Sequence, residues 1–354
     1  FKLLKDCYIH KNPTKLKNSF CILKFDFSAV STKGDVDENF SIDCNFAIKR
    51  FVNRYEFDID IDLYKPAHLN LKKLFETLKQ THPDTKIYVL IDEYDNFMND
   101  LLMNDKKQYD KLVSSTEAVY KEFFKLLKAL TNENDSLLKK MFFTGVSPLA
   151  LFDVTSGSNI GINITNKYEF NSMLGITKDE FKVLREHYNI NLNQNELKVL
   201  DSWYNNYKFN KDINESIYNT DMILYYINER KLSGKIPDNL IDINVRTDYS
   251  KLKYLVHTNN RLNGNFNVLK TLFAQNYILV DTIKDSFSSY ELIKQENFIS
   301  LLYYLGLVTI DNSTIQGIKL HIPNQTIRVI MAEFLNTMLV DTKTLEVDLR
   351  EFHQ

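Results

Sequence analysis

The chain has 354 residues, with 44 basic and 46 acidic side chains and a formal net charge of −2. This balance gives no indication of binding to nucleic acid or to an anionic membrane surface. Hydrophobic residues make up 44% of the chain and aromatic residues 13%, which is typical of a globular protein. No apolar run approaches the roughly 20 residues of a membrane-spanning helix, so we expect a soluble protein with two or three modules.

The cysteines, Cys7, Cys21 and Cys44, are odd in number and lack the CxxC spacing of metal sites. Such a pattern fits a reducing compartment better than a disulfide scaffold, so we expect a cytoplasmic, intracellular location. The histidines are scattered and have no metal-site spacing, so structural zinc is not expected.

The first predicted elements are one strand and two helices. Residues 19–28 are mostly apolar strand formers and predict a strand. A helix is expected over about 37–55, and a second one around 71–78 that ends before Pro83. Their apolar and aromatic stripes are interpreted as core-facing surfaces.

The next predicted strand ends in two adjacent carboxylates. Strand formers run without a break from Ile87 to Ile91 and are followed by Asp92 and Glu93. Such a run predicts a buried parallel strand that brings acids to the carboxyl edge of a sheet, where open α/β sheets bind ligands. Asp92 is suited to holding Mg²⁺, and Glu93 to polarising a water aimed at a phosphate. This is the Walker-B arrangement of nucleotide hydrolases, although an acidic loop after an apolar strand is also common elsewhere.

A long helix over about 104–131 and a strand over 139–145 complete a βαβ order. That strand stops at Thr144 and a glycine. In ATPases of the AAA kind, a strand beside the Walker-B strand carries a polar residue that senses the terminal phosphate, and Thr144 occupies this place. A threonine that merely ends a strand before a turn is the competing interpretation.

One part of an ATP site is absent from the sequence. No GxxxxGK[ST] motif occurs, and the first glycine is Gly34. Such a loop lets backbone N–H groups approach phosphate oxygens, so tight triphosphate binding is hard to explain without it. We therefore expect either a longer parent protein or a degenerate relative of the ATPases.

The region after the predicted sheet changes to a glycine-containing loop over 156–161 and then to short helices. Thr177 with Glu180 is a capping-box start. Helices are then expected over 196–203, 220–230 and 247–256. We predict an all-helical lid over 166–285, after a core over 1–165.

Residues 286–354 are predicted to form a third, winged-helix-like module. It would contain a helix over 289–305, a hairpin over 307–322 and a helix over 324–339. Its basic residues form no stripe, which favours packing or protein contact over DNA binding. Between residues 289 and 340 they are Lys294, Lys319 and Arg328.

Several stretches, in the same order along nearly the whole chain, resemble the AAA-ATPase-like family, whose members often continue into a PD-(D/E)XK nuclease domain. The matching stretches are 90–95 (Leu-Ile-Asp-Glu-Tyr-Asp), 143–146 (Phe-Thr-Gly-Val), 166–177, 203–209, Tyr218-Asn219, 302–306 and 322–324. Asn206 departs from the pattern, because a glycine is usual there. Leu307 and Gln325-Thr326 also differ from the usual family pattern. None of these departures involves the proposed hydrolytic acids.

The resemblance implies a P-loop NTPase-like α/β parallel sheet that uses ATP and Mg²⁺. By position, Asp92 would be the Mg²⁺ ligand and Glu93 the catalytic base that polarises water. Thr144 would be the catalytic sensor, and Asp95 would join Asp92 in binding the nucleotide. The phosphate-binding loop is expected before Phe1.

The same resemblance implies that a nuclease core follows Gln354. The chain would then be an ATPase regulatory module that controls a nuclease-like effector. Two other hypotheses stay open: a non-catalytic protein-interaction module derived from an ATPase, and DNA binding through the winged-helix-like module over 289–340.

Overall fold

The computed structural model describes residues 5–115, 117–148, 153, 161–242, 256–258, 261–262, 264–292, 294–315 and 317–341. The chain forms two compact units, residues 1–161 and residues 162–354. The predicted loop over 156–161 and the predicted helix over 247–256 lie outside the described residues, apart from Gly161 and Val256. Within the described ranges, no helix has both the length and the apolar character needed to cross a membrane.

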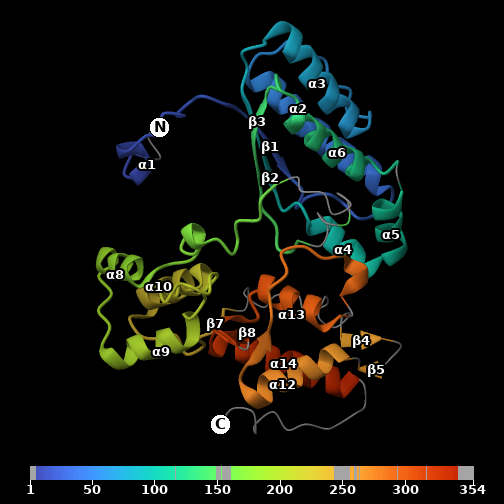
Figure 1. Cartoon of the computed structure of the whole chain (residues 1–354). Coiled ribbons are helices and arrows are strands. Elements are labelled where there is room, and N and C mark those ends of the chain that lie inside the picture. Colours follow the sequence, from blue (N-terminus) through green and yellow to red (C-terminus); the bar gives the residue numbers. More distant parts are fainter. Residues whose placement is uncertain are drawn as a thin grey trace. The chain divides into compact units, whose positions relative to one another are not determined.

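The first unit alternates strands with helices, as Figure 1 shows. Its elements are α1 (Tyr8–Lys11), β1 (Cys21–Asp26), α2 (Val36–Arg54), α3 (Ala67–Thr81), β2 (Ile87–Asp92), α4 (Asn96–Asn104), α5 (Lys106–Ser114), α6 (Val119–Asn132) and β3 (Leu138–Phe143). The three strands expected from the sequence are therefore confirmed, as are the helices around 37–55 and 71–78.

The three strands form one parallel sheet in the order β1-β2-β3. In the registers of the two strand pairs, Ile91 of β2 lies beside Phe25 of β1 and beside Phe143 of β3. The α/β class predicted from the sequence is thus confirmed. Because all three strands run the same way, their carboxyl ends meet at one edge.

The core of the first unit lies on one face of this sheet, where α2, α3 and α6 run alongside the strands (Figure 1). Alternate residues of β1 and β2 are buried, and those between them are more exposed. Large rings fill the helix side: the Phe27 and Phe40 centroids lie 5.0 Å apart, and those of Phe25 and Phe123 lie 5.1 Å apart. Such edge-to-face pairs stabilise the core beyond their buried area.

The long helix predicted over 104–131 is wrong as a single element. The structure divides it into α5 and α6, because Ser115 and Ala118 have extended backbone angles, with ψ of 132° and 128°. Serine side chains compete with helical hydrogen bonds, and Ser115 Oγ accepts a hydrogen bond from Glu117 N at 3.1 Å. The apolar stripe of α6 itself is buried as expected.

The second unit begins with helices and contains two small sheets. Its elements are η2 (Tyr168–Phe170), α8 (Lys178–His187), α9 (Gln194–Tyr204), α10 (Thr220–Ser233), β4 (His257–Thr258), β5 (Arg261–Leu262), α12 (Gly264–Gln275), β6 (Ile278–Val280), η4 (Ser289–Glu291), α13 (Gln295–Tyr304), β7 (Thr309–Thr314), β8 (Gly317–His321) and α14 (Gln325–Asp341). The predicted order of helix, hairpin and helix after residue 289 is confirmed.

The prediction that residues 166–285 are all-helical is wrong. Strands β4 and β5 pair with each other, and β6 joins the hairpin in a sheet of order β6-β8-β7. Strand β6 contains only three residues, which is too short to show a period of two in the sequence. The lid and winged-helix assignments stay predictions.

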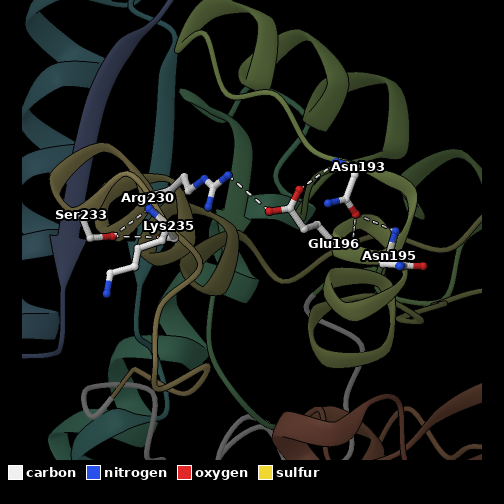
Figure 2. A network of polar contacts seen from close by, with 6 residues as sticks. All are labelled: Asn193, Asn195, Glu196, Arg230, Ser233 and Lys235. Carbon is white, nitrogen blue, oxygen red and sulfur yellow. Dashed lines mark hydrogen bonds and ion pairs between the residues drawn. The ribbon is translucent and has the colours of Figure 1, made fainter.

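Capping boxes begin the first helices of the second unit. The predicted box at α8 is confirmed, since Thr177 and Glu180 bond each other's backbone N–H groups. A second box begins α9, where Glu196 Oε2 accepts from Asn193 N at 2.7 Å (Figure 2). The other carboxylate oxygen of Glu196 accepts from Arg230 of α10 at 3.3 Å. One glutamate therefore caps the start of α9 and ties that helix to α10.

Asn206, where the resembling family usually has a glycine, has a φ of +79°. This is the left-handed region, which asparagine enters more readily than most residues. The backbone turn that a glycine would make is therefore also available to Asn206.

Candidate functional site

The carboxyl edge of the parallel sheet brings the sequence-predicted residues Asp92 and Thr144 together. Asp92 ends β2, the central strand, and lies beside Asp26, which ends β1. Thr144 directly follows β3 on the other side, and its backbone N–H donates to Ile91 O at 2.9 Å. The backbone pairing thus holds both residues at the same edge.

Both oxygens of the Asp92 carboxylate are held by side chains from neighbouring strands. Thr144 Oγ1 donates to Oδ1 at 2.5 Å. From the other side, Lys24 Nζ of β1 lies 3.3 Å from Oδ2. The Asp92 side chain is nevertheless 45% exposed, so an external ligand has access to it.

These contacts lower the pKa of Asp92 below its usual range. The larger cause is the hydrogen bond from Thr144, which favours the charged form, followed by the hydrogen bond and positive charge of Lys24. Partial burial raises the pKa of Asp92, but the lowering by Thr144 and Lys24 together is larger. Asp92 is therefore a carboxylate at neutral pH, which is the form that binds a cation.

Glu93 has an unusual backbone conformation, with a φ of +54°. This left-handed region is uncommon for residues other than glycine and costs conformational energy. The turn is fixed on both sides, because Tyr94 N donates to Thr144 O at 3.0 Å and Asn96 N donates to Glu93 O at 3.1 Å. The half-buried Glu93 is thereby held next to Asp92 at the sheet edge.

Asp95 is fully buried, and its carboxylate accepts four hydrogen bonds. Two come from the backbone N–H groups of Val146 and Ser147, at 3.0 and 2.8 Å. The others come from the Ser147 hydroxyl at 3.1 Å and from Asn99 Nδ2 at 2.6 Å. The structure therefore directs Asp95 towards the loop after Thr144, away from the exposed part of the edge.

Gly145 makes this packing possible. A Cβ atom built there would lie 2.5 Å from Asp95 Oδ1 and 2.6 Å from the Tyr94 ring. Such distances are too short for any side chain to occupy. Thr144 thus supplies the hydroxyl that bonds Asp92, and Gly145 leaves the space that the Asp95 carboxylate occupies.

Lys24 and Asp26 were not identified from the sequence as site residues. The sequence pattern that could have identified them is the alternation Lys24-Phe25-Asp26-Phe27. It places Lys24 and Asp26 on one sheet face and the two rings on the other. Phe25 and Phe27 are buried, and both charged residues are exposed. Their proximity to Asp92 depends on the β1-β2 register, which the sequence does not state.

The oxygen donors at this edge fit Mg²⁺, which is usually held by one or two carboxylates together with waters and substrate phosphates. Asp92 and Asp26 supply two carboxylates on adjacent strands, and Thr144 supplies a hydroxyl. A positive charge already lies beside Asp92, the ammonium group of Lys24. Within the described residues, no group of three or more His, Cys, Asp or Glu side chains is placed to hold a metal ion, so a cation here would rely on one or two carboxylates together with waters and phosphate oxygens.

A polar pocket of about 240 Å³ lies elsewhere in the first unit. Its lining includes Gly34, Asp37, Gln108 and Lys111, and it does not include Asp92. Burial raises the pKa of Asp37, whose carboxylate accepts from Val119 N at 2.9 Å. This pocket has mixed charge and no link to the sheet-edge residues.

Three basic residues of the C-terminal module have partners within the second unit. Lys294 pairs with Glu291, and Lys319 Nζ lies 2.9 Å from Asp311 Oδ2. Arg328 donates to the side chain of Asn276 at 2.7 Å. These contacts favour a structural role for the three basic residues over phosphate binding.

Comparison with family models gives a match over residues 1–155 to the model AAA-ATPase_like, described as Predicted AAA-ATPase. This segment contains all three strands of the parallel sheet and the residues at its carboxyl edge. Neither the curated proteins nor the solved structures gave a match.

Proposed function

Because residues 1–155 belong to the AAA-ATPase-like family, we propose that this chain is an ATP-binding and ATP-hydrolysing regulatory module. The observation that carries the proposal is the hydrogen bond from Thr144 to Asp92 between adjacent parallel strands. It joins the candidate phosphate sensor to the candidate cation ligand, and Glu93 is next in the chain.

Each side chain at the edge has a distinct role in this proposal. Asp92 supplies carboxylate oxygens for Mg²⁺, with its orientation held by Thr144. The ion, when bound with ATP, neutralises charge on the phosphates. Glu93 orients a water and accepts its proton, and the Thr144 hydroxyl, which has one proton to donate, exchanges Asp92 for an oxygen of the terminal phosphate when ATP binds.

The regulatory part of the proposal follows from the family resemblance. ATP binding would change the population of two arrangements of a helical lid and thereby control a nuclease-like effector. Because the printed sequence lacks a GxxxxGK[ST] loop, we expect this chain by itself to bind ATP weakly. Tests of its chemistry therefore need ATP at millimolar concentration.

The Glu93→Gln substitution tests the proposed base. It keeps the shape of the side chain and removes its ability to accept a proton. We expect Mg²⁺-dependent ATP hydrolysis to fall at least about 100-fold, because general-base catalysis contributes that much or more. Phosphate release is the measurement, and Glu76→Gln on the exposed part of α3 is the matched control.

Two results would count against the proposal in different ways. Equal rates for the wild-type chain and Glu93→Gln would reject Glu93 as the base. Absence of Mg²⁺-dependent hydrolysis from the wild-type chain would favour the non-catalytic interaction module.

A further inference from the structure

The contact between Lys24 and Asp92 has a consequence for cation binding. Lys24 extends from β1, and its Nζ lies 3.3 Å from Oδ2 of Asp92. Thr144 bonds the other oxygen, Oδ1, from the opposite side. Lys24 therefore takes the carboxylate oxygen that Thr144 leaves open.

We infer that Lys24 is a positioning residue that competes with a divalent cation for Asp92 and so sets the metal affinity of the site. This inference rests on the proposed function, because it takes Asp92 to be the cation ligand. The ammonium group orients the carboxylate while no metal is bound and has to move when a metal binds.

Electrostatics gives the direction of the effect. A divalent cation at Oδ2 would come within about 5 Å of the Lys24 ammonium. The two positive charges repel each other, and in a water-exposed site this weakens metal binding on the order of tenfold. Removing the charge of Lys24 should therefore strengthen metal binding, whereas loss of a merely structural contact would weaken it.

The pair can open because it is exposed. The side chains of Lys24 and Asp92 are 54% and 45% exposed, and ion pairs of this kind contribute little to stability. Asp26 offers Lys24 another acceptor, since it lies two residues along β1 on the same sheet face. Ser28 fixes Asp26 Oδ1 through bonds of 2.7 and 3.1 Å, so this carboxylate has a defined position. Lys24 thus has an alternative anionic partner in Asp26 when Asp92 is the carboxylate that holds the metal.

Mn²⁺, which is paramagnetic and takes the same oxygen ligands as Mg²⁺, is the probe for this inference. Its binding to the 354-residue chain is measured by electron paramagnetic resonance in the absence of ATP. We expect Lys24→Met to bind Mn²⁺ about tenfold more tightly than the wild-type chain. Lys24→Arg keeps the charge and should restore the wild-type affinity.

Two further variants separate this inference from the proposed function. Lys140→Met is the matched control, because Lys140 lies on the same sheet beside Tyr88 and further from the edge, and should leave the affinity unchanged. Asp92→Asn should remove the binding in both the wild-type and the Lys24→Met backgrounds. If Asp92→Asn loses Mn²⁺ binding but Lys24→Met binds Mn²⁺ no more tightly than the wild-type chain, the role of Lys24 is overturned and the metal site stands. Unchanged binding by Asp92→Asn, or no binding by either the wild-type chain or Lys24→Met, would overturn both.

Discussion

Asp92, the last residue of β2, and Asp95, in the turn that follows, have opposite surroundings. Asp92 is 45% exposed and bonds two side chains. Asp95 is fully buried and accepts four hydrogen bonds. A buried carboxylate whose oxygens are all bonded inside the protein has little capacity for a ligand, whereas an exposed one with exposed partners is accessible to it.

The difference separates ligand binding from support of the site. In the proposed function Asp92 binds the cation, whereas Asp95 holds the loop that begins at Thr144 through its hydrogen bonds to Val146 and Ser147. The sequence placed Asp95 with Asp92 as a nucleotide-binding residue; that role stays a prediction, while the four hydrogen bonds of Asp95 favour a structural role. Asp95 would then affect the nucleotide only through the position of Thr144.

The strongest test of the comparison is Asp95→Ala. The substitution leaves the N–H groups of Val146 and Ser147 and the amide of Asn99 without their buried acceptor. We expect the free energy of unfolding to fall by about 3 kcal/mol, because each unsatisfied buried donor is costly. Urea denaturation measures the change.

Asp92→Ala is the matched control for this experiment. It removes an exposed carboxylate with one hydroxyl and one ammonium partner, and should cost less than about 1 kcal/mol. Similar losses for the two variants would mean that Asp92 also serves the fold, which would remove the contrast between the two aspartates.

Gly145→Ala should have the next largest effect. Its Cβ would lie 2.5 Å from Asp95 Oδ1 and 2.6 Å from the Tyr94 ring, so the buried turn has to shift. Overpacking of this kind costs about 2 kcal/mol. Gly161→Ala is the control, since no atom lies within 4 Å of its added Cβ and it should change stability by less than about 0.5 kcal/mol. Equal unfolding midpoints for the two alanine variants would contradict the packing at Gly145.

A smaller effect of opposite sign is expected for Glu93→Gly. Glycine accepts the φ of +54° without the steric cost that glutamate has, so stability should rise by about 0.5 kcal/mol. Glu56→Gly, at a φ of +56° far from the edge in the sequence, should give a similar gain. Only the change at Glu93 should abolish ATP hydrolysis. A loss of stability from Glu93→Gly would show that the glutamate side chain supports the turn.

The sequence was sufficient for the sheet because its strands are marked by local patterns. The apolar run before Asp92 and the hydroxyl at Thr144 predicted two neighbouring strand ends, and the structure joins them by a hydrogen bond. The sequence could not distinguish the exposed Asp92 from the buried Asp95, because burial of a carboxylate depends on which loop packs against it. In this chain that loop is 146–147, more than 50 residues away.

Other misses had the same origin in contacts distant along the chain. Lys24 reaches Asp92 across 68 positions of sequence, through the β1-β2 register. The short strand β6 is defined mainly by its pairing with β8 and carries too few residues for a pattern of its own. Local signals did succeed where the contact itself is local, as in the capping box of Thr177 and Glu180.

The smallest expected effect concerns the charge of Asp92. Thr144→Val removes the hydroxyl but keeps the shape, so the pKa of Asp92 should rise towards its ordinary value. Because the folded pKa is depressed, the stability that Asp92 contributes is complete above its unfolded pKa of about 3.9 and is lost as the pH falls through the folded pKa. Thr144→Val should therefore reduce the fall in stability across this acidic range, and Lys24→Met should reduce it less, since Thr144 is the larger cause. Carbon-13 titration of the Asp92 carboxyl in the three chains measures both shifts. A larger rise in the pKa of Asp92 for Lys24→Met than for Thr144→Val would mean that the ammonium group, and not the Thr144 hydroxyl, is the main partner that keeps Asp92 charged.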